Sequence, residues 1–329
     1  MIQKGAVRVS SVFPGLELGD EVSEVMHADN CSVLKIENET GEGIMTCYML
    51  FPGVVVMYND FHMSYCDTSF ETDGQQMLCV DHCREGSMER FVRPEVYYYF
   101  SPGNCAVDVR RYHAGRTNFP QNHFHGVSIG FYLPQASEQL VKELRGFPVS
   151  LESLRQKFCA DGEPNVLSKS EEAERIFHTF YTLPKENRRE YLRLKIFELL
   201  LHLDGLDTGN IGIAKPYFYK SQVDKIKAAE RLITENLTKS YTIVQLAERF
   251  DISQSALKSC FKEIFGLPIN TYLQEHRIRR AAVLLREDQN LSVSQAAGMV
   301  GYDSPGKFAA IFKRIYGVTP REYQRGGLL

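Results

Sequence analysis

The 329-residue chain lacks the features that would place it in a membrane or outside the cell. No apolar run reaches the roughly 18 to 20 residues that a membrane-spanning helix needs. Met1 is not followed by an apolar stretch of signal-peptide length. No low-complexity tract interrupts a composition that is 43% hydrophobic and 24% charged. We therefore expect a globular, cytoplasmic protein with no membrane partner, long enough for two domains.

The eight cysteines include no CxxC pair and are scattered along the chain. Without an export signal, this pattern predicts neither a disulfide framework nor a zinc site of paired cysteines. Reduced thiols, buried as small hydrophobic side chains, are the simplest interpretation. Because Cys79 and Cys83 lie close to His82, a redox or metal sensor built on these three residues is kept as an alternative.

Charge is unevenly distributed although the net charge is only −3. From Pro216 onward there are 17 Lys and Arg against 11 Asp and Glu, about +6, whereas the first 215 residues carry 21 against 30, about −9. A basic module attached to an acidic one favours a polyanion as the partner of the basic half.

The first 134 residues contain short apolar and aromatic runs separated by turn residues. This spacing predicts an antiparallel β barrel or sandwich, which can enclose one small ligand. The predicted strands are 44–50, 54–57, 77–80, 96–100, 106–110 and 127–133, with breaks at 51–53, 72–74, 85–86 and 101–104.

His123-Phe124-His125 is the motif in this region with metal-binding chemistry. On a strand both imidazoles would share one face, as a metal site requires. Metal-binding barrels of the cupin type usually add a carboxylate a few residues later, and residues 126–131 contain none. We therefore predict no metal, no cofactor and no catalytic residue. The side chains expected to line a ligand pocket, with core packing as the alternative for the tyrosines, are Tyr97, Tyr99, His113, His123 and His125.

Residues 135–205 change to helical periodicity. The predicted helices are 135–145, 151–158, 171–183 and 187–203. The last of them is apolar on more than one stripe, so it is expected to be buried on two sides, either within the chain or against a second copy. The polar, glycine-bearing segment 206–221 is predicted to be a linker.

The C-terminal region contains a repeated unit, whose copies lie about 50 residues apart. Each copy begins with a capping box, at Thr242 and at Ser292, and its second helix ends at a glycine, Gly266 or Gly317. The second helices are predicted to bury apolar residues at i, i+3, i+4 and i+7, which form a single stripe. These residues are Leu257, Cys260, Phe261 and Ile264 in one copy and Phe308, Ile311, Phe312 and Ile315 in the other. A helix, a short turn and a second helix form a helix-turn-helix.

A single helix over 268–285 is predicted to connect the two units. At 1.5 Å per residue it is about 27 Å long. Two second helices held that far apart can enter neighbouring major-groove segments, which lie about 34 Å apart on one face of the duplex. The sequence therefore predicts an all-α domain at 222–329 that binds double-stranded DNA.

Several motifs in this domain resemble the AraC/XylS family of transcription regulators, over about residues 222–325. They are Ala282-Val283-Leu284-Leu285, Ser292-Val293, Val300-Gly301-Tyr302, and Phe308-x-x-x-Phe312-Lys313-x-x-x-Gly317-Val318-Thr319-Pro320-x-x-Tyr323. The resemblance implies a DNA-binding module coupled to an N-terminal effector or dimerisation domain, commonly a cupin-like barrel followed by helices. The expected class is α+β: a cupin-like β domain at 1–134, a helical dimerisation region at 135–205, the linker, and the DNA-binding domain. The stretch from Phe261 to Tyr272 is also similar to regulators of siderophore uptake.

The solvent-facing residues of the two second helices are the candidates for DNA contact. In the second copy the solvent-facing side of this helix includes Pro305, Gly306 and Ala309. Proline and alanine cannot donate side-chain hydrogen bonds. We therefore expect the first copy to recognise bases, and the second mainly to hold phosphates or touch a thymine methyl. The candidates are Gln254, Ser255, Lys258, Ser259 and Lys262 in the first copy and Lys307, Ala310, Lys313 and Arg314 in the second.

These observations predict a ligand-responsive transcription regulator without enzymatic activity. A small-molecule effector in the barrel is expected to change how helices 171–183 and 187–203 pair or contact the DNA-binding domain. A homodimer is expected, and RNA polymerase is a partner if the regulator activates. The alternatives are a metal-dependent cupin enzyme, opposed by the missing carboxylate, and a DNA repair protein with a zinc-bound cysteine, opposed by the lack of a four-cysteine group.

Overall fold

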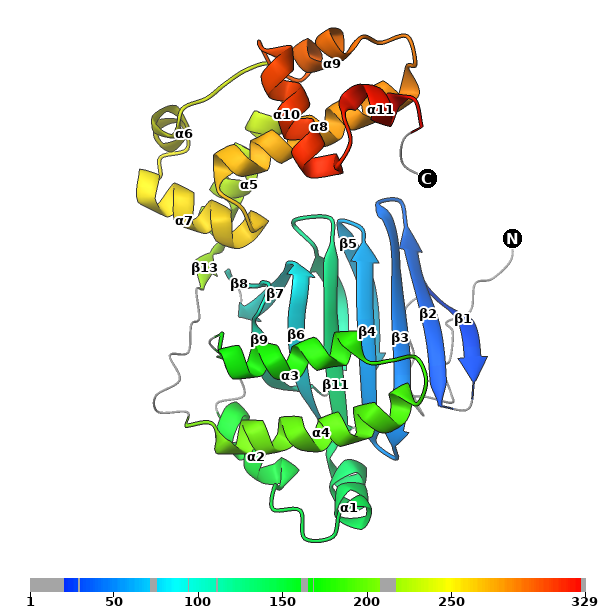
Figure 1. Cartoon of the computed structure of the whole chain (residues 1–329). Coiled ribbons are helices and arrows are strands. Elements are labelled where there is room, and N and C mark those ends of the chain that lie inside the picture. The colour runs from blue at the N-terminus through cyan, green and yellow to red at the C-terminus, as the bar shows by residue number, and fades with distance from the viewer. Residues whose placement is uncertain are drawn as a thin grey trace, which may run out of the picture. The chain divides into compact units, whose positions relative to one another are not determined.

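The computed structural model describes residues 21–28, 30–71, 76–93, 95–110, 112–160, 165–167, 169–207 and 217–326. The chain divides into two compact units, Met1–Tyr217 and Phe218–Leu329, and each is described by itself (Figure 1). The predicted turn at 72–74 and residues 208–216 of the predicted linker lie outside the described residues.

The N-terminal unit is built on a large sheet with the strand order β1-β2-β3-β4-β11-β6-β9-β12. A second sheet has the order β8-β7-β10-β5 within this unit. Neighbouring strands in both sheets are antiparallel. The first sheet contains β1 (Val22–Ala28), β2 (Cys31–Asn38), β3 (Gly41–Phe51), β4 (Val54–His62), β6 (Met77–Gly86), β9 (Cys105–Arg110), β11 (Phe124–Tyr132) and β12 (Asn165–Leu167), and the second contains β5 (Tyr65–Glu71), β7 (Met88–Arg93), β8 (Val96–Phe100) and β10 (Tyr112–Asn118).

The predicted antiparallel β architecture is confirmed, whereas its cupin-like classification stays a prediction. In this unit, β1, β2, β5, β7, β10 and β12 are not among the strands predicted from the sequence. Strands such as β5 and β10 are rich in polar residues and show little of the apolar alternation by which a strand is recognised. They are held by pairing with each other, from Tyr112 opposite Glu71 to Asn118 opposite Tyr65.

Two hydrophobic cores cover the two faces of the large sheet. Strand β4 shows the division, because its side chains alternate between the faces. Val54, Val56 and Tyr58 belong to the core that the sheet shares with the helices. We call this side of the sheet the helix-covered face. Val55 and Phe61 belong to the core between the two sheets, which we call the inter-sheet core.

The space between the sheets also holds a buried ionic cluster. Arg90 on β7 donates to Asp81 on β6 at 2.8 Å, and Arg110 on β9 pairs with both Asp81 and Asp108. Burial opposes ionisation of Asp81, but the guanidinium groups of Arg110 and Arg90 outweigh it and hold the pKa of Asp81 at about 2. Charged side chains therefore link the two sheets, a contact that was not predicted from the sequence.

The helices of the N-terminal unit lie on the helix-covered face (Figure 1). They are α1 (Leu133–Glu143), α2 (Leu151–Cys159), α3 (Glu171–Thr182) and α4 (Arg188–Gly205). One stripe of α4, including Leu192, Ile196 and Leu199, is fully buried. A second stripe is not covered by its own unit, and Leu194 and Leu201 in it are 67% and 48% exposed. Burial of both stripes within one chain is therefore wrong, and burial of the second stripe against another copy stays a prediction.

The C-terminal unit is helical apart from the short strand β13 (Phe218–Tyr219). Its helices are α5 (Lys220–Glu235), α6 (Ile243–Arg249), α7 (Gln254–Phe265), α8 (Ile269–Glu287), α9 (Val293–Met299), α10 (Pro305–Tyr316) and α11 (Pro320–Gln324). Among the described residues of either unit, no helix combines the length and apolarity needed to cross a membrane.

Candidate nucleic-acid interface

The first helix-turn-helix consists of α6 and α7. The predicted capping box is present, because Thr242 accepts from the backbone of Gln245 at 3.1 Å and the Gln245 side chain accepts from Thr242 N at 2.9 Å. The apolar stripe of α7 is buried as predicted, with Leu257 and Phe261 fully enclosed. The helix ends at Gly266, whose φ of 77° is in the left-handed region that favours glycine.

The second helix-turn-helix, α9 and α10, repeats this arrangement with one difference. Ser292 and Gln295 form the matching capping box. Phe308 and Phe312 are buried, but Ile315 is 36% exposed, so its predicted burial is wrong. The ring of Tyr316 stacks on Phe312 at 4.8 Å and fills the end of the core in place of Ile315.

Helix α8 connects the two helix-turn-helix motifs and packs against both. Tyr272, near its start, packs against the rings of Phe261 and Phe265 on α7 at 5.3 and 5.1 Å. The Tyr272 hydroxyl also donates to Glu230 on α5 at 2.9 Å. Near its other end, Ala282 and Leu285 share a core with α9 and α10. At 19 residues, α8 is about 28 Å long.

All five candidate residues on α7 are exposed. They are Gln254, Ser255, Lys258, Ser259 and Lys262. The Ser259 hydroxyl donates to the Ser255 carbonyl oxygen at 3.0 Å, so it is already engaged within the helix. Gln254 is the first residue of α7 and follows the N-cap Ser253. An exposed amide at this position can pair with the edge of an adenine in the major groove.

The candidates on α10 are exposed too, and they are chemically different. Lys307, Lys313 and Arg314 supply positive charge, while Ala310 offers a methyl group. Arg314 donates to Gln274 on α8 at 2.7 Å, which directs its guanidinium group along the domain surface. The structure therefore presents the expected asymmetry between the two second helices, and the roles of these residues in DNA contact stay predictions.

The candidate pocket residues on β8 face away from the inter-sheet core. Strand alternation places Tyr98 and Phe100 in that core, and Tyr97 and Tyr99 on the opposite side of β8. The Tyr99 hydroxyl donates to the buried carboxylate of Glu89 at 2.6 Å. The Tyr99 hydroxyl therefore already has a hydrogen-bond partner within the protein. The His113 side chain, on β10, lies outside what the structure describes.

His123 and His125 lie on the helix-covered side of the large sheet, because Phe124 between them enters the inter-sheet core. His125 is half-buried, with its ring edge-on to Tyr181 of α3 at 5.4 Å. Burial lowers the pKa of His125. The structure does not bring these imidazoles together with the candidate tyrosines of β8.

The residues of the redox-sensor alternative do not converge. His82 packs on the helix-covered face against Phe177, whereas Cys83 belongs to the inter-sheet core. Burial raises the pKa of both Cys79 and Cys83, which keeps the thiols protonated and unreactive. All eight cysteines are thiols, and all except Cys31 are buried.

Residues 246–326 match a family model described as a helix-turn-helix domain. One relative is the F1 operon positive regulatory protein of Yersinia pestis, 37% identical over 93 residues, which cover 28% of this chain and 31% of the relative. Another is the HTH-type transcriptional regulator AlkR of Acinetobacter baylyi, 36% identical over 87 residues, or 26% of this chain and 28% of the relative.

Among solved structures, the C-terminal domain of the two-component response regulator yesN from Fusobacterium nucleatum subsp. nucleatum is 30% identical, with a TM-score of 0.29. The alignment covers 31% of this chain and 98% of that one. The chain spans less than a third of the length of the two curated relatives above. Residues 246–326, with their paired helix-turn-helix units on a shared helix, are a DNA-binding domain of the AraC type.

Proposed function

We propose that this protein is a transcription regulator that binds double-stranded DNA with α7 and α10 in successive major-groove segments. The observation that carries the proposal is the attachment of two capped helix-turn-helix units to the two ends of one helix, α8. A helix of about 28 Å spans most of the 34 Å between neighbouring major-groove segments.

In this proposal α7 recognises bases and α10 mainly holds the phosphate backbone. The exposed amide of Gln254 and the hydroxyl of Ser255 can bind base edges, whereas the start of α10 carries Pro305 and Gly306. Lys307 and Lys313 supply charge for phosphate contacts. The excess of basic residues in this unit supports the same partner.

The N-terminal unit is proposed to be a non-enzymatic effector and dimerisation domain of a cytoplasmic regulator. The exposed stripe of α4, with Tyr191, Leu194 and Leu201, is the surface proposed to bind a second copy of the chain. A small-molecule effector bound by this unit would act by preferring one arrangement of α3 and α4. Contact with RNA polymerase follows if the protein activates transcription. The Yersinia pestis relative is named a positive regulatory protein.

Selection of genomic fragments by the purified full-length chain, followed by a salt titration of the selected duplex, tests the proposal. We expect a site with two segments about one helical turn apart, and an affinity that falls steeply with salt. A random duplex of equal length is the control. Binding to selected fragments that is no tighter than binding to this control would refute sequence-specific recognition.

A further inference from the structure

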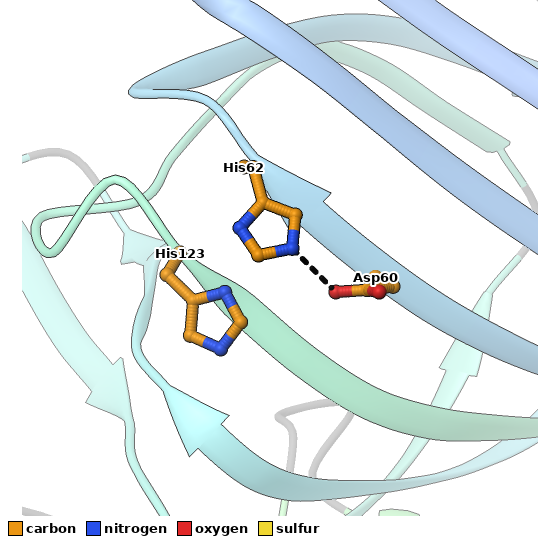
Figure 2. A group of neighbouring side chains, drawn as sticks. All are labelled: Asp60, His62 and His123. Atoms are coloured by element: carbon orange, nitrogen blue, oxygen red, sulfur yellow. Dashed lines mark ion pairs between the residues drawn. The ribbon is translucent and has the colours of Figure 1, made fainter. Parts of the chain in front are cut away.

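Three side chains with metal-ligating chemistry meet at one end of the large sheet, on its helix-covered side. Asp60 and His62 are two residues apart on β4, so they point to the same face. His123 comes directly before β11, which pairs with β4 so that Phe124 lies opposite Phe61. The register therefore places His123 next to His62, although the two residues are 61 positions apart in the chain. Figure 2 shows the three side chains together.

The ligand atoms of this cluster are close enough for one ion. One nitrogen or oxygen from each of Asp60, His62 and His123 lies within 4.8 Å of the others. His62 Nε2 is 3.2 Å from Asp60 Oδ1, and the two imidazole rings stack with centroids 4.7 Å apart. Two ligands of a tetrahedral zinc ion, each bound at about 2.0–2.1 Å, lie roughly 3.3 Å apart. The pair on β4 already has this spacing.

The side chains of His62 and Asp60 have room to turn toward His123. The side chains of His62 and Asp60 are 63% and 53% exposed, so both can rotate without disturbing a core. By contrast, the backbone at His123 is fixed. Ser87 N donates to the His123 carbonyl oxygen at 3.3 Å. Gly86, with a φ of 77°, lies so close to this carbonyl that a Cβ there would overlap it.

The two nitrogens of His123 have different surroundings. Nε2 lies 3.7 Å from the Glu85 carboxylate on β6. Nδ1 is buried and has no hydrogen-bond partner among the described residues. A histidine that binds a metal commonly directs its other nitrogen at a carboxylate, which fixes the tautomer and the ring orientation. Glu85 is placed for that role, which leaves Nδ1 as the atom facing the ion.

We propose that Asp60, His62 and His123 bind a divalent transition-metal ion of the zinc class, with Glu85 as a positioning residue. Two imidazoles and one carboxylate favour such an ion over Mg²⁺ or Ca²⁺, which take oxygen ligands. The bound ion joins the end of β4 to the turn that precedes β11. Three protein ligands leave a coordination position for water or another small ligand. The sequence considerations predicted no metal at the His123 and His125 pair, and this site differs from that pair because Asp60 and His62 come from another strand. The site is independent of the proposed DNA binding.

Zinc affinity of the full-length chain, stripped of metal and measured by competition with a chromophoric chelator, tests the site. We expect one ion per chain with a dissociation constant of about 1 μM or tighter. His62→Ala and His123→Ala should each weaken binding at least tenfold. His27→Ala is the matched control, because this exposed imidazole on β1 also lies 3.2 Å from a carboxylate, that of Glu24. It should leave the affinity unchanged.

Glu85→Gln separates positioning from ligation. With Co²⁺ as the probe, this variant should keep the visible absorption spectrum of the wild type and bind more weakly, whereas His62→Ala should change the spectrum. Zinc should also raise the melting temperature of the wild type more than that of His62→Ala. Equal melting temperatures of the wild type and His62→Ala in the absence of metal would show that the variant is folded.

The proposal is overturned if the double variant His62→Ala/His123→Ala binds zinc as tightly as the wild type, or if His27→Ala loses as much affinity as either single variant. It is also overturned if the wild type binds less than one ion per chain at micromolar zinc. Because no DNA is present, none of these results bears on the proposed DNA binding.

Discussion

The imidazole of His82 on β6 stacks on the ring of Phe177 on α3, with centroids 4.2 Å apart and planes inclined by 10°. The Tyr181 hydroxyl lies 3.0 Å from His82 Nδ1, so the same histidine binds the last turn of α3. Burial lowers the pKa of His82 to about 4, from an ordinary value of 6.5. The attachment of α3 to the sheet therefore depends on a neutral imidazole.

This arrangement predicts that acid destabilises the N-terminal unit. Between pH 6.5 and pH 4, the unfolded chain takes up a proton at His82 that the folded chain does not. The free energy of unfolding should fall by up to about 3 kcal/mol over this range, at 1.36 kcal/mol per pH unit, and this contribution should then level off. Urea unfolding at several pH values measures it.

His82→Phe should remove this part of the pH dependence while keeping a ring against Phe177. His178→Phe, at an exposed position on α3, is the control and should retain it. Identical pH profiles for wild type and His82→Phe would show that other groups cause the acid sensitivity.

Removal of a phosphate-binding lysine should weaken DNA binding in a salt-dependent way. Lys258→Ala on α7 and Lys307→Ala on α10 should each reduce the slope of log affinity against log salt by about 0.9, because one fewer counterion is released. Fluorescence anisotropy across a salt series gives the slope. Lys142→Ala, an equal change of charge on α1, should not alter it. An unchanged slope in both α7 and α10 variants contradicts the assignment.

Gln254 should contribute to sequence discrimination, unlike Lys307. Gln254→Ala should reduce the preference for the selected site over random DNA by about 1–3 kcal/mol, since a base contact is lost. Lys307→Ala should weaken binding to both duplexes alike. Parallel titrations with the two duplexes measure the ratio. If Gln254→Ala lowers both affinities equally, α7 does not recognise a base through this residue.

The exposed stripe of α4 should hold a homodimer together. Leu194→Lys places a charge in the proposed interface and should convert the dimer to a monomer, as measured by sedimentation equilibrium at micromolar concentration. Val141→Lys is the control, because Val141 is similarly exposed, at 65%, on α1. A wild-type chain that is monomeric with and without DNA rules out this interface.

The helical repeat could be predicted almost completely from sequence because its signals are local. The capping boxes at Thr242 and Ser292, the apolar stripe of α7 and the glycines that end the second helices are each specified within about a dozen residues. Ile315 is the exception. Its exposure depends on Tyr316 reaching Phe312 and Tyr323, a contact that periodicity does not reveal.

The paired helix-turn-helix and the antiparallel β class of the N-terminal unit could therefore be predicted from the sequence alone. The residues that meet on the sheet could not be predicted in this way, because strand pairing joins positions far apart in the chain and is seen only in the folded structure. It placed His123 beside His62 and Asp60, and it placed Tyr98 rather than Tyr99 in the inter-sheet core. The tertiary structure also leaves the Leu194 side chain of α4 exposed to solvent. Helix signals are encoded among neighbouring residues, whereas the face and register of a strand are fixed by the strands on either side of it.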